Sequence, residues 1–377
     1  MATVTDVNQL NGLFKKIYAD KIENLIPDVS VIQKMVPFSD ASKIGESYNQ
    51  PVKLTGITYA AAGAGAFALN QSVALTTKNA VIQGSQMVLR DQMSYAAAAK
   101  SSHGGAKSFV EGTRYLVDCM LETMSKRLEI AMIYGNAGLG IPATSTNVSS
   151  TETKLNFAVA EWSVGIWSGL ENAIVNFYAN NVSSGLVGTS ADSLFTVSTM
   201  DTDARTVNVT GTATGISALD VAINSASPLL PVSVYFNGAF GNEMSGLDKI
   251  ITNTGTLFNI SAATYNLWRG NSYAVGNAAL SLNHIYKAVG AAVGRGLNED
   301  VTCFVNPDTW KDLGTDLAAQ RYLDRSYKSS QNENGQEKIV YYGANGKIDI
   351  VSHNVIKGGE AFILPVRRVK RIGASDI

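Results

Sequence analysis

The chain has 377 residues, 45% of them hydrophobic, so it is long enough to bury a large core in two or three domains. Its formal net charge is −1 and only 16% of its residues are charged, which argues against a nucleic-acid reader that binds through overall basic charge. Two cysteines, Cys119 and Cys303, exclude a disulfide framework, and their surroundings predict two small buried hydrophobic side chains.

Residues 1–42 are predicted to form an arm ahead of the compact body. Leu13, Phe14 and Ile17 belong to a short amphipathic helical pattern, and Pro27 and Pro37 then favour extended or turn structure. The segment lacks the basic-then-apolar order of a signal sequence, and no uncharged run of the chain is apolar enough to cross a membrane. We therefore expect a protein that stays in a cytoplasm and an arm that docks on its own body or on a neighbour.

Residues 43–92 are predicted to form a long β-hairpin with strands near 47–58 and 79–91. Pro51 favours an edge position, and the Gly/Ala-rich tip between the strands is expected to be flexible. A hairpin this long is marginal in water by itself. We expect it to project onto another subunit; the alternative is a hairpin folded back on its own domain.

Residues 106–136 are predicted to form the longest helix of the chain. Apolar residues recur on one face, namely Phe109, Leu116, Met120, Met124, Leu128 and Ala131, widened by Val110, Val117, Leu121 and Met132. Charged residues fall largely on the opposite side: Arg114, Asp118, Glu122, Lys126 and Glu129. Gly135 and Asn136 suit a left-handed cap after the last turn. Such a helix needs a sheet or a broad surface to lie across, unless it is an ordinary core helix.

The rest of the chain predicts a mixed α+β body. Its expected elements, in order, are a polar loop at 139–153, a helix at 162–179, a small inserted β subdomain at 192–260, a helix at 278–296, a strand at 301–306, a helix from Pro307 to about Tyr322, a polar loop at 326–338, and strands at 338–342, 347–353 and 361–369.

No catalytic, cofactor-binding or metal site is predicted. The three histidines, His103, His284 and His353, are isolated in the sequence, and a lone histidine is more often structural than a ligand. Phosphate-binding loops and nucleophile elbows are also absent from the sequence. The basic run at 366–371 favours either a polar strand edge or inter-subunit ion pairs, with phosphate contact as the alternative.

Several segments resemble one family. They are EWSVGIWSGLENA (161–173), GNEMSGLDKIITNTG (241–255), NLWRGN (266–271), FVNPDTWKDL (304–313) and the tail from 347 to 377. Together with the order of arm, hairpin, long helix and mixed body, they resemble the major capsid proteins of tailed bacteriophages with the HK97-type fold. The resemblance covers essentially the whole chain as an order of elements.

The resemblance implies an α+β HK97-like capsid fold in five parts. They are an N-terminal arm (1–42), an extended E-loop hairpin (43–100), a P-domain with the long spine helix (101–154), an A-domain with a small β-rich insertion at about 190–265 (155–335), and C-terminal strands that return to the P-domain (336–377). It also implies a set of candidate inter-subunit contacts: Leu13, Phe14, Ile17, Lys53, Tyr59, Phe67, Leu69, Lys78, Arg90, Arg367 and Arg368.

The function implied is that of a major capsid protein, with no enzymatic activity and no cofactor. Such subunits assemble as hexamers and pentamers into an icosahedral shell around phage double-stranded DNA. Portal, scaffolding and any decoration proteins would be partners, contact with DNA would be non-specific, and no membrane is involved. The shell would assemble in the bacterial host cytoplasm and become the virion capsid. The alternatives are an encapsulin-like nanocompartment shell, and an enzyme with an unrecognised site.

Overall fold

The computed structural model describes residues 30–40, 47–56, 74–90, 92–96, 99, 112–224, 231–276, 278–315 and 339–373. The chain divides into two units, Met1–Pro27 with Arg90–Leu121, and Asp28–Leu89 with Glu122–Ile377. Every strand named below lies in the second unit. The predicted mixed α+β class is confirmed.

The second unit begins with a one-turn helix, α1 (Ile32–Met35), and a short strand, β1 (Phe38–Asp40). The predicted hairpin is confirmed, because β2 (Ser47–Lys53) pairs with β3 (Thr77–Gln83) in antiparallel register. Both strands are shorter than predicted, and the tip and the predicted helix of the arm lie outside the described residues. Pro51 is compatible with this position because β2 has a single partner strand.

The long helix is confirmed as α3 (Gly112–Tyr134), with residues 106–111 outside the described part of the chain. Its burial changes along its length. Every residue from Leu128 to Tyr134 is buried, whereas Val117 and Leu121, predicted to widen the apolar face, are 48% and 54% exposed. The predicted stripe therefore describes only part of the helix, since its last two turns are enclosed on all sides.

The predicted cap after α3 is confirmed. Asn136 adopts a left-handed backbone conformation with φ 58°, and a side chain at Gly135 would collide with the Met244 carbonyl oxygen. The α3 helix thus ends where only a glycine fits the close approach of another loop.

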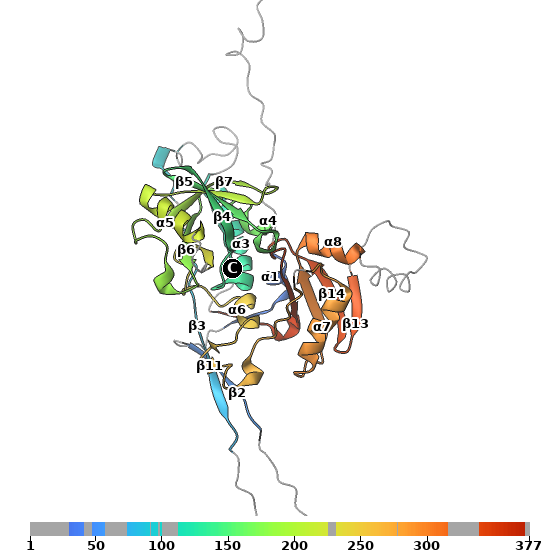
Figure 1. Cartoon of the computed structure of the whole chain (residues 1–377). Coiled ribbons are helices and arrows are strands. Elements are labelled where there is room, and N and C mark those ends of the chain that lie inside the picture. The colour runs from blue at the N-terminus through green and yellow to red at the C-terminus, as the bar shows by residue number, and fades with distance from the viewer. Residues whose placement is uncertain are drawn as a thin grey trace, which may run out of the picture. The chain divides into compact units, whose positions relative to one another are not determined.

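The largest sheet has six antiparallel strands in the order β4-β5-β8-β7-β6-β9. Its strands are β4 (Pro142–Ser149), β5 (Glu152–Phe157), β6 (Ile174–Ala179), β7 (Phe195–Asp201), β8 (Thr206–Thr210) and β9 (Val232–Phe236). Helix α5 (Ala213–Asn224) packs beside β4 and buries Ile216, Leu219 and Ile223 in the same core (Figure 1). This core also holds the end of α3.

Two local predictions in this region are wrong. The polar loop predicted at 139–153 is β4 and the start of β5, and it looked like a loop because six of the eight β4 residues are exposed. The helix predicted at 162–179 is a 3₁₀ turn, η2 (Val159–Glu161), a one-turn helix, α4 (Val164–Trp167), and then β6. Left-handed backbone at Gly169 and Asn172 ends the helical spacing, and the Ile174–Tyr178 run is rich in strand formers.

The predicted β insertion is also corrected. Strands β7 and β8 lie between β5 and β6, and β9 pairs with β6, so residues 192–260 do not form a small sheet of their own. After β9 come α6 (Leu247–Ile251), the two-residue strands β10 (Thr256–Leu257) and β11 (Ile260–Ser261), and the 3₁₀ turn η4 (Asn266–Trp268). A further 3₁₀ turn, η3 (Ser183–Gly185), follows β6.

The last part of the chain forms a four-stranded sheet in the order β13-β14-β12-β15. Its elements confirm the predicted order: α7 (Leu282–Val293), β12 (Val301–Val305), α8 (Pro307–Thr315), β13 (Ile339–Gly343), β14 (Gly346–Ser352) and β15 (Ala361–Leu364). Helix α7 packs on this sheet through Leu282, Ile285 and Val289 (Figure 1). Cys303 is fully buried there, as predicted, whereas Cys119 is only half-buried. The continuation of α8 to Tyr322 and the loop at 326–338 lie outside the described residues.

The chain ends in a 3₁₀ turn, η6 (Val366–Arg368), and β16 (Arg371–Gly373). Strand β16 pairs in parallel with β1, with Phe38 opposite Arg371. The predicted last strand, 361–369, is therefore β15 followed by the turn η6.

Candidate assembly surface and the junction that supports it

The described contact candidates are all exposed. Lys53 is the last residue of β2. Lys78 lies in β3 and is paired with Val52, the residue before Lys53. Arg90 is also exposed and belongs to the first unit, while Arg367 and Arg368 lie in η6. The other candidates lie outside the described residues: Leu13, Phe14, Ile17, Tyr59, Phe67 and Leu69.

The two described strands of the hairpin carry charge of one sign. Their charged residues are Lys53 and Lys78, and neither strand contains an aspartate or glutamate. Most side chains of β2 and β3 are exposed or half-buried. The two strands thus present a cationic ribbon whose polar side chains are available to an acidic or neutral partner surface.

The described strands of the hairpin are fixed to their own body. Leu54 and Ala80 form a small buried cluster with Ile260 of β11, against which Phe258 and Trp268 pack. The Val81 N–H donates to the Phe258 carbonyl at 3.0 Å. Apolar contact and a backbone hydrogen bond therefore hold the ribbon on the loop that carries β10 and β11.

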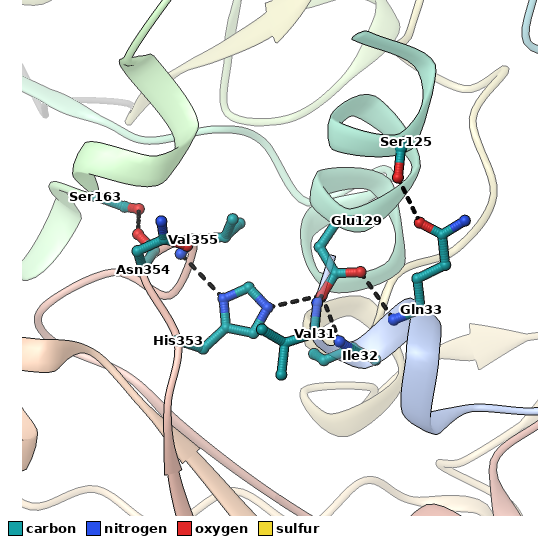
Figure 2. A network of polar contacts seen from close by, with 9 residues as sticks. All are labelled: Val31, Ile32, Gln33, Ser125, Glu129, Ser163, His353, Asn354 and Val355. Carbon is teal, nitrogen blue, oxygen red and sulfur yellow. Dashed lines mark hydrogen bonds and ion pairs between the residues drawn. The ribbon is translucent and has the colours of Figure 1, made fainter. Parts of the chain in front are cut away.

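A second feature is a carboxylate buried at the junction of three segments (Figure 2). Glu129 of α3 is fully buried, and its two oxygens accept from the backbone N–H groups of Val31, Ile32 and Gln33 at 3.0, 2.5 and 2.9 Å. Ser125, one turn earlier, donates to the Gln33 side chain at 2.8 Å. These bonds satisfy N–H groups at the start of α1 and hold the N-terminal segment against α3.

His353, directly after β14, completes the junction. Its Nε2 lies 2.7 Å from Glu129 Oε1, and both side chains are fully buried. Its Nδ1 accepts from the Val355 N–H at 3.1 Å, so Nε2 carries the proton that is donated to Glu129. The next residue, Asn354, accepts through its carbonyl from the Ser163 hydroxyl at 2.6 Å. The expectation that a lone histidine is structural is met for His353.

Sequence reasoning misplaced Glu129. Helical spacing put it on the polar side of α3, but it is the one charged residue in the LEIAMIY run (128–134), which is otherwise apolar or aromatic. A run that is apolar on all sides of a helix predicts full enclosure, and a charge within it then requires partners. Those partners are far away in the sequence, so the pattern identifies the need without identifying the bonds.

A neighbouring polar cluster surrounds Tyr134 at the end of α3. Its hydroxyl donates to Glu360 at 2.8 Å and accepts from the Lys357 N–H at 2.9 Å. The Lys357 ammonium lies 3.3 Å from Glu161. Burial raises the pKa values of Glu360 and Asp248, with the cation of Lys357 acting in the opposite direction. Carboxyl groups in this cluster thus outnumber the nearby lysine.

The basic run at the chain end is tied to its own subunit in part. The Arg368 guanidinium pairs with Glu299, which precedes β12, through Nε at 2.8 Å and through a second contact from Nη2. Arg368 is 71% exposed, so the pair is a surface ion pair of small energetic weight. This favours the polar-edge interpretation of the run at Arg368.

Within the described ranges, no group of three or more His, Cys, Asp or Glu side chains is arranged to hold a metal ion. In the same part of the chain, no helix is both long and apolar enough to span a membrane.

No protein-family model matches the sequence, and no curated protein is detectably similar to it. Among solved structures, the fold is similar to that of a chain in the "Cyanophage A-1(L) capsid asymmetric unit". The TM-score is 0.56 at 11% sequence identity, and the match covers 98% of this chain and 78% of that one. At this identity the likeness establishes the fold alone, and the chain thus has the fold of a cyanophage capsid chain.

Proposed function

We propose that this chain is the major capsid protein of a tailed bacteriophage and has the HK97-type fold. The observation that carries the proposal is the fold similarity to a cyanophage capsid chain over nearly the whole length. Copies would assemble as hexamers and pentamers into an icosahedral shell around double-stranded DNA. Portal, scaffolding and any decoration proteins would be its partners, and the virion capsid its location.

The proposed parts follow from this function. Residues 1–42 serve as the N-terminal arm, 43–100 as the E-loop, 101–154 as the P-domain, 155–335 as the A-domain and 336–377 as the returning strands. The apolar anchor and the exposed strands of the hairpin support its role as a contact element, because the anchor holds Leu54 and Ala80 on the body while the cationic ribbon stays accessible. The Glu129 junction supports the arm by fixing residues 31–33 on α3.

The test is assembly of the purified chain, alone and with candidate scaffolding protein, followed by electron microscopy and sedimentation. Closed icosahedral particles are expected. A second protein in which a two-residue Asn-Gly turn replaces residues 55–75 should keep Leu54 opposite Thr76, keep the Leu54–Ile260 anchor and remain soluble, yet fail to close shells. A full-length chain that stays monomeric under all these conditions would contradict the proposed function. Normal shells from the shortened protein would contradict only the role of the hairpin.

A further inference from the structure

The outer edge of the six-stranded sheet has an unusual composition. Strand β4 is one edge of that sheet, and its sequence, PATSTNVS, contains no charged residue. Six of its eight residues are exposed. Natural edge strands commonly carry lysine, other charges or proline at exposed positions, because an open edge pairs readily with another strand. Here Pro142 lies at the very start of the strand, so the middle of β4 needs another form of protection.

The opposite edge strand is covered by the chain itself. On β9, the Leu139 N–H donates to the Val234 carbonyl at 2.8 Å, and the Val234 N–H donates to the Gly140 carbonyl at 3.0 Å. A passing backbone segment therefore occupies the outward backbone groups of Val234, the middle residue of β9. The β4 edge is treated differently.

The backbone of β4 is occupied by a side chain that imitates a strand. The carboxamide oxygen of Asn224 accepts from the Ser145 N–H at 3.0 Å, and its nitrogen donates to the Ser145 carbonyl at 3.0 Å. One amide group thus takes both outward backbone groups of one residue, as a residue of an added antiparallel strand would. The Asn224 nitrogen also lies 2.9 Å from the Ser145 hydroxyl.

The position of this contact along β4 is also informative. Register shifts interrupt the pairing of β4 with β5 between Pro142 and Thr144 and again between Asn147 and Ser149. The regular part of the edge is therefore only Thr144–Asn147, and Ser145 lies within it. Irregular pairing at both ends discourages strand addition there, so the Asn224 contact falls on the stretch where another strand would otherwise fit.

Asp220, one turn before Asn224 in α5, fixes the helix on the sheet and so positions Asn224. Asp220 accepts from the Thr153 hydroxyl of β5 at 2.6 Å and from the Asn147 side chain of β4 at 3.2 Å. Residues 220 and 224 lie on the same face of the helix, as their spacing requires. An open groove lined by Asn147, Ser217, Asp220, Val221 and Asn224 lies beside this contact, so water and other chains reach it.

We infer that β4 is a latent self-pairing edge and that Asn224 is the side chain that keeps it closed. The partner excluded is β4 of a second copy of this chain. Two features favour strand addition between two such edges: neither strand carries a charge that would repel the other, and both have the same short regular stretch. In a protein that is present at high local concentration, the Asn224 side chain prevents irregular association through β4.

The experiment compares full-length variants by sedimentation velocity and by hydrogen exchange of the amides of residues 143–148. N224A should raise the fraction of irregular, polydisperse species several-fold over wild type, with the β4 amides more protected in the associated material. N224D also loses the donated bond but places a negative charge on the edge, so it should associate less than N224A. V221A, which changes an exposed residue of the same groove without touching β4, should behave as wild type.

A second variant distinguishes the loss of the edge contact in N224A from a loss of folding stability. Thr146 of β4 is exposed and lies within the regular stretch, and N224A/T146K adds a lysine there without restoring the lost bonds. Association should fall back to the wild-type level in this double variant. Association that persists in it would overturn the inference, as would an N224A protein that sediments as wild type does. Neither outcome depends on whether the chain forms capsids.

Discussion

At the scale of single residues, Glu129 joins segments that are remote in the sequence. Its carboxylate binds backbone groups about one hundred residues earlier and a histidine 224 residues later. All four partners donate hydrogen bonds to the carboxylate, so it satisfies donors from segments both before and after it in the sequence. The site is fully buried, so water does not reach these groups. Such a group contributes to stability mainly because its removal leaves other buried groups unpaired.

We predict that E129A strongly destabilises the body. It strands three backbone N–H groups and His353, which should lower the free energy of unfolding by about 3–5 kcal/mol. Urea denaturation followed by tryptophan fluorescence measures this. D118A changes an exposed residue of the same helix and should stay within about 0.5 kcal/mol of wild type. A loss in E129A as small as that in D118A would show that the junction does not hold the N-terminal segment.

The cluster around Tyr134 predicts a dependence of stability on pH. The folded state raises the pKa values of Glu360 and Asp248 above their unfolded values, mainly through burial. The folded protein therefore binds these protons more tightly, so these groups should lower stability as the pH rises from the ordinary carboxyl range through their folded pKa values.

E360Q removes one of these titrations. Denaturation midpoints measured across this pH range should fall less steeply with rising pH in E360Q than in wild type. D308N, at an exposed carboxyl group at the start of α8, serves as the control and should leave the slope unchanged. A slope in E360Q equal to that of wild type would contradict the assignment.

At the scale of elements, the hairpin and the loop around β11 share one small apolar cluster, so we expect them to loosen together. The anchor is small, since its fully enclosed side chains are Leu54, Ala80 and Ile260. Removing part of it should therefore free the hairpin without unfolding the six-stranded sheet, whose core is separate and much larger.

We predict that I260A loosens the hairpin locally. Truncating a fully buried isoleucine costs about 2–5 kcal/mol, and here the loss should appear as faster hydrogen exchange in β2 and β3. The amides of β7 and β8 should exchange as in wild type. I250A, at a 39% exposed residue of α6, is the matched control. Uniformly faster exchange across both regions would show that the anchor belongs to the main core.

At the scale of the whole molecule, the proposed shell requires surfaces that meet other copies without weakening the fold. The exposed cations of the hairpin suit this requirement, since they contribute little to the stability of one subunit and can steer its association. Reversing their charge should affect assembly and spare folding.

K53E/K78E is therefore expected to melt as wild type does and to assemble more slowly or not at all. Light scattering during assembly at low and high salt measures the effect, which should diminish as salt screens the charges. K287E/K311E reverses two exposed lysines of α7 and α8 and gives the same change in net charge, so it is the matched control. Assembly in K53E/K78E that is indistinguishable from K287E/K311E would exclude an electrostatic role for the hairpin.

The sequence by itself determined the elements whose signals are local. Helix α7 begins directly after its cap residue Ser281, whose hydroxyl accepts from the His284 N–H, and its apolar residues recur at helical spacing. Helix α8 begins at Pro307, and β12 and β15 are short, largely apolar runs. In the hairpin, two strand patterns flank a Gly/Ala-rich segment of the sequence. Capping, proline geometry and periodicity act over a few residues, so they can be read without the fold.

Only the tertiary structure decided which segments form edge strands, which apolar runs are strands and not helices, and which charged residue is buried. The polar β4 looked like a loop because exposed edge strands lack apolar alternation, and β6 looked helical because its apolar spacing fits both periods. Glu129 looked exposed because its partners lie in α1 and beyond β14. These outcomes depend on contacts between residues far apart in the chain, and such contacts leave no local pattern from which they could be predicted.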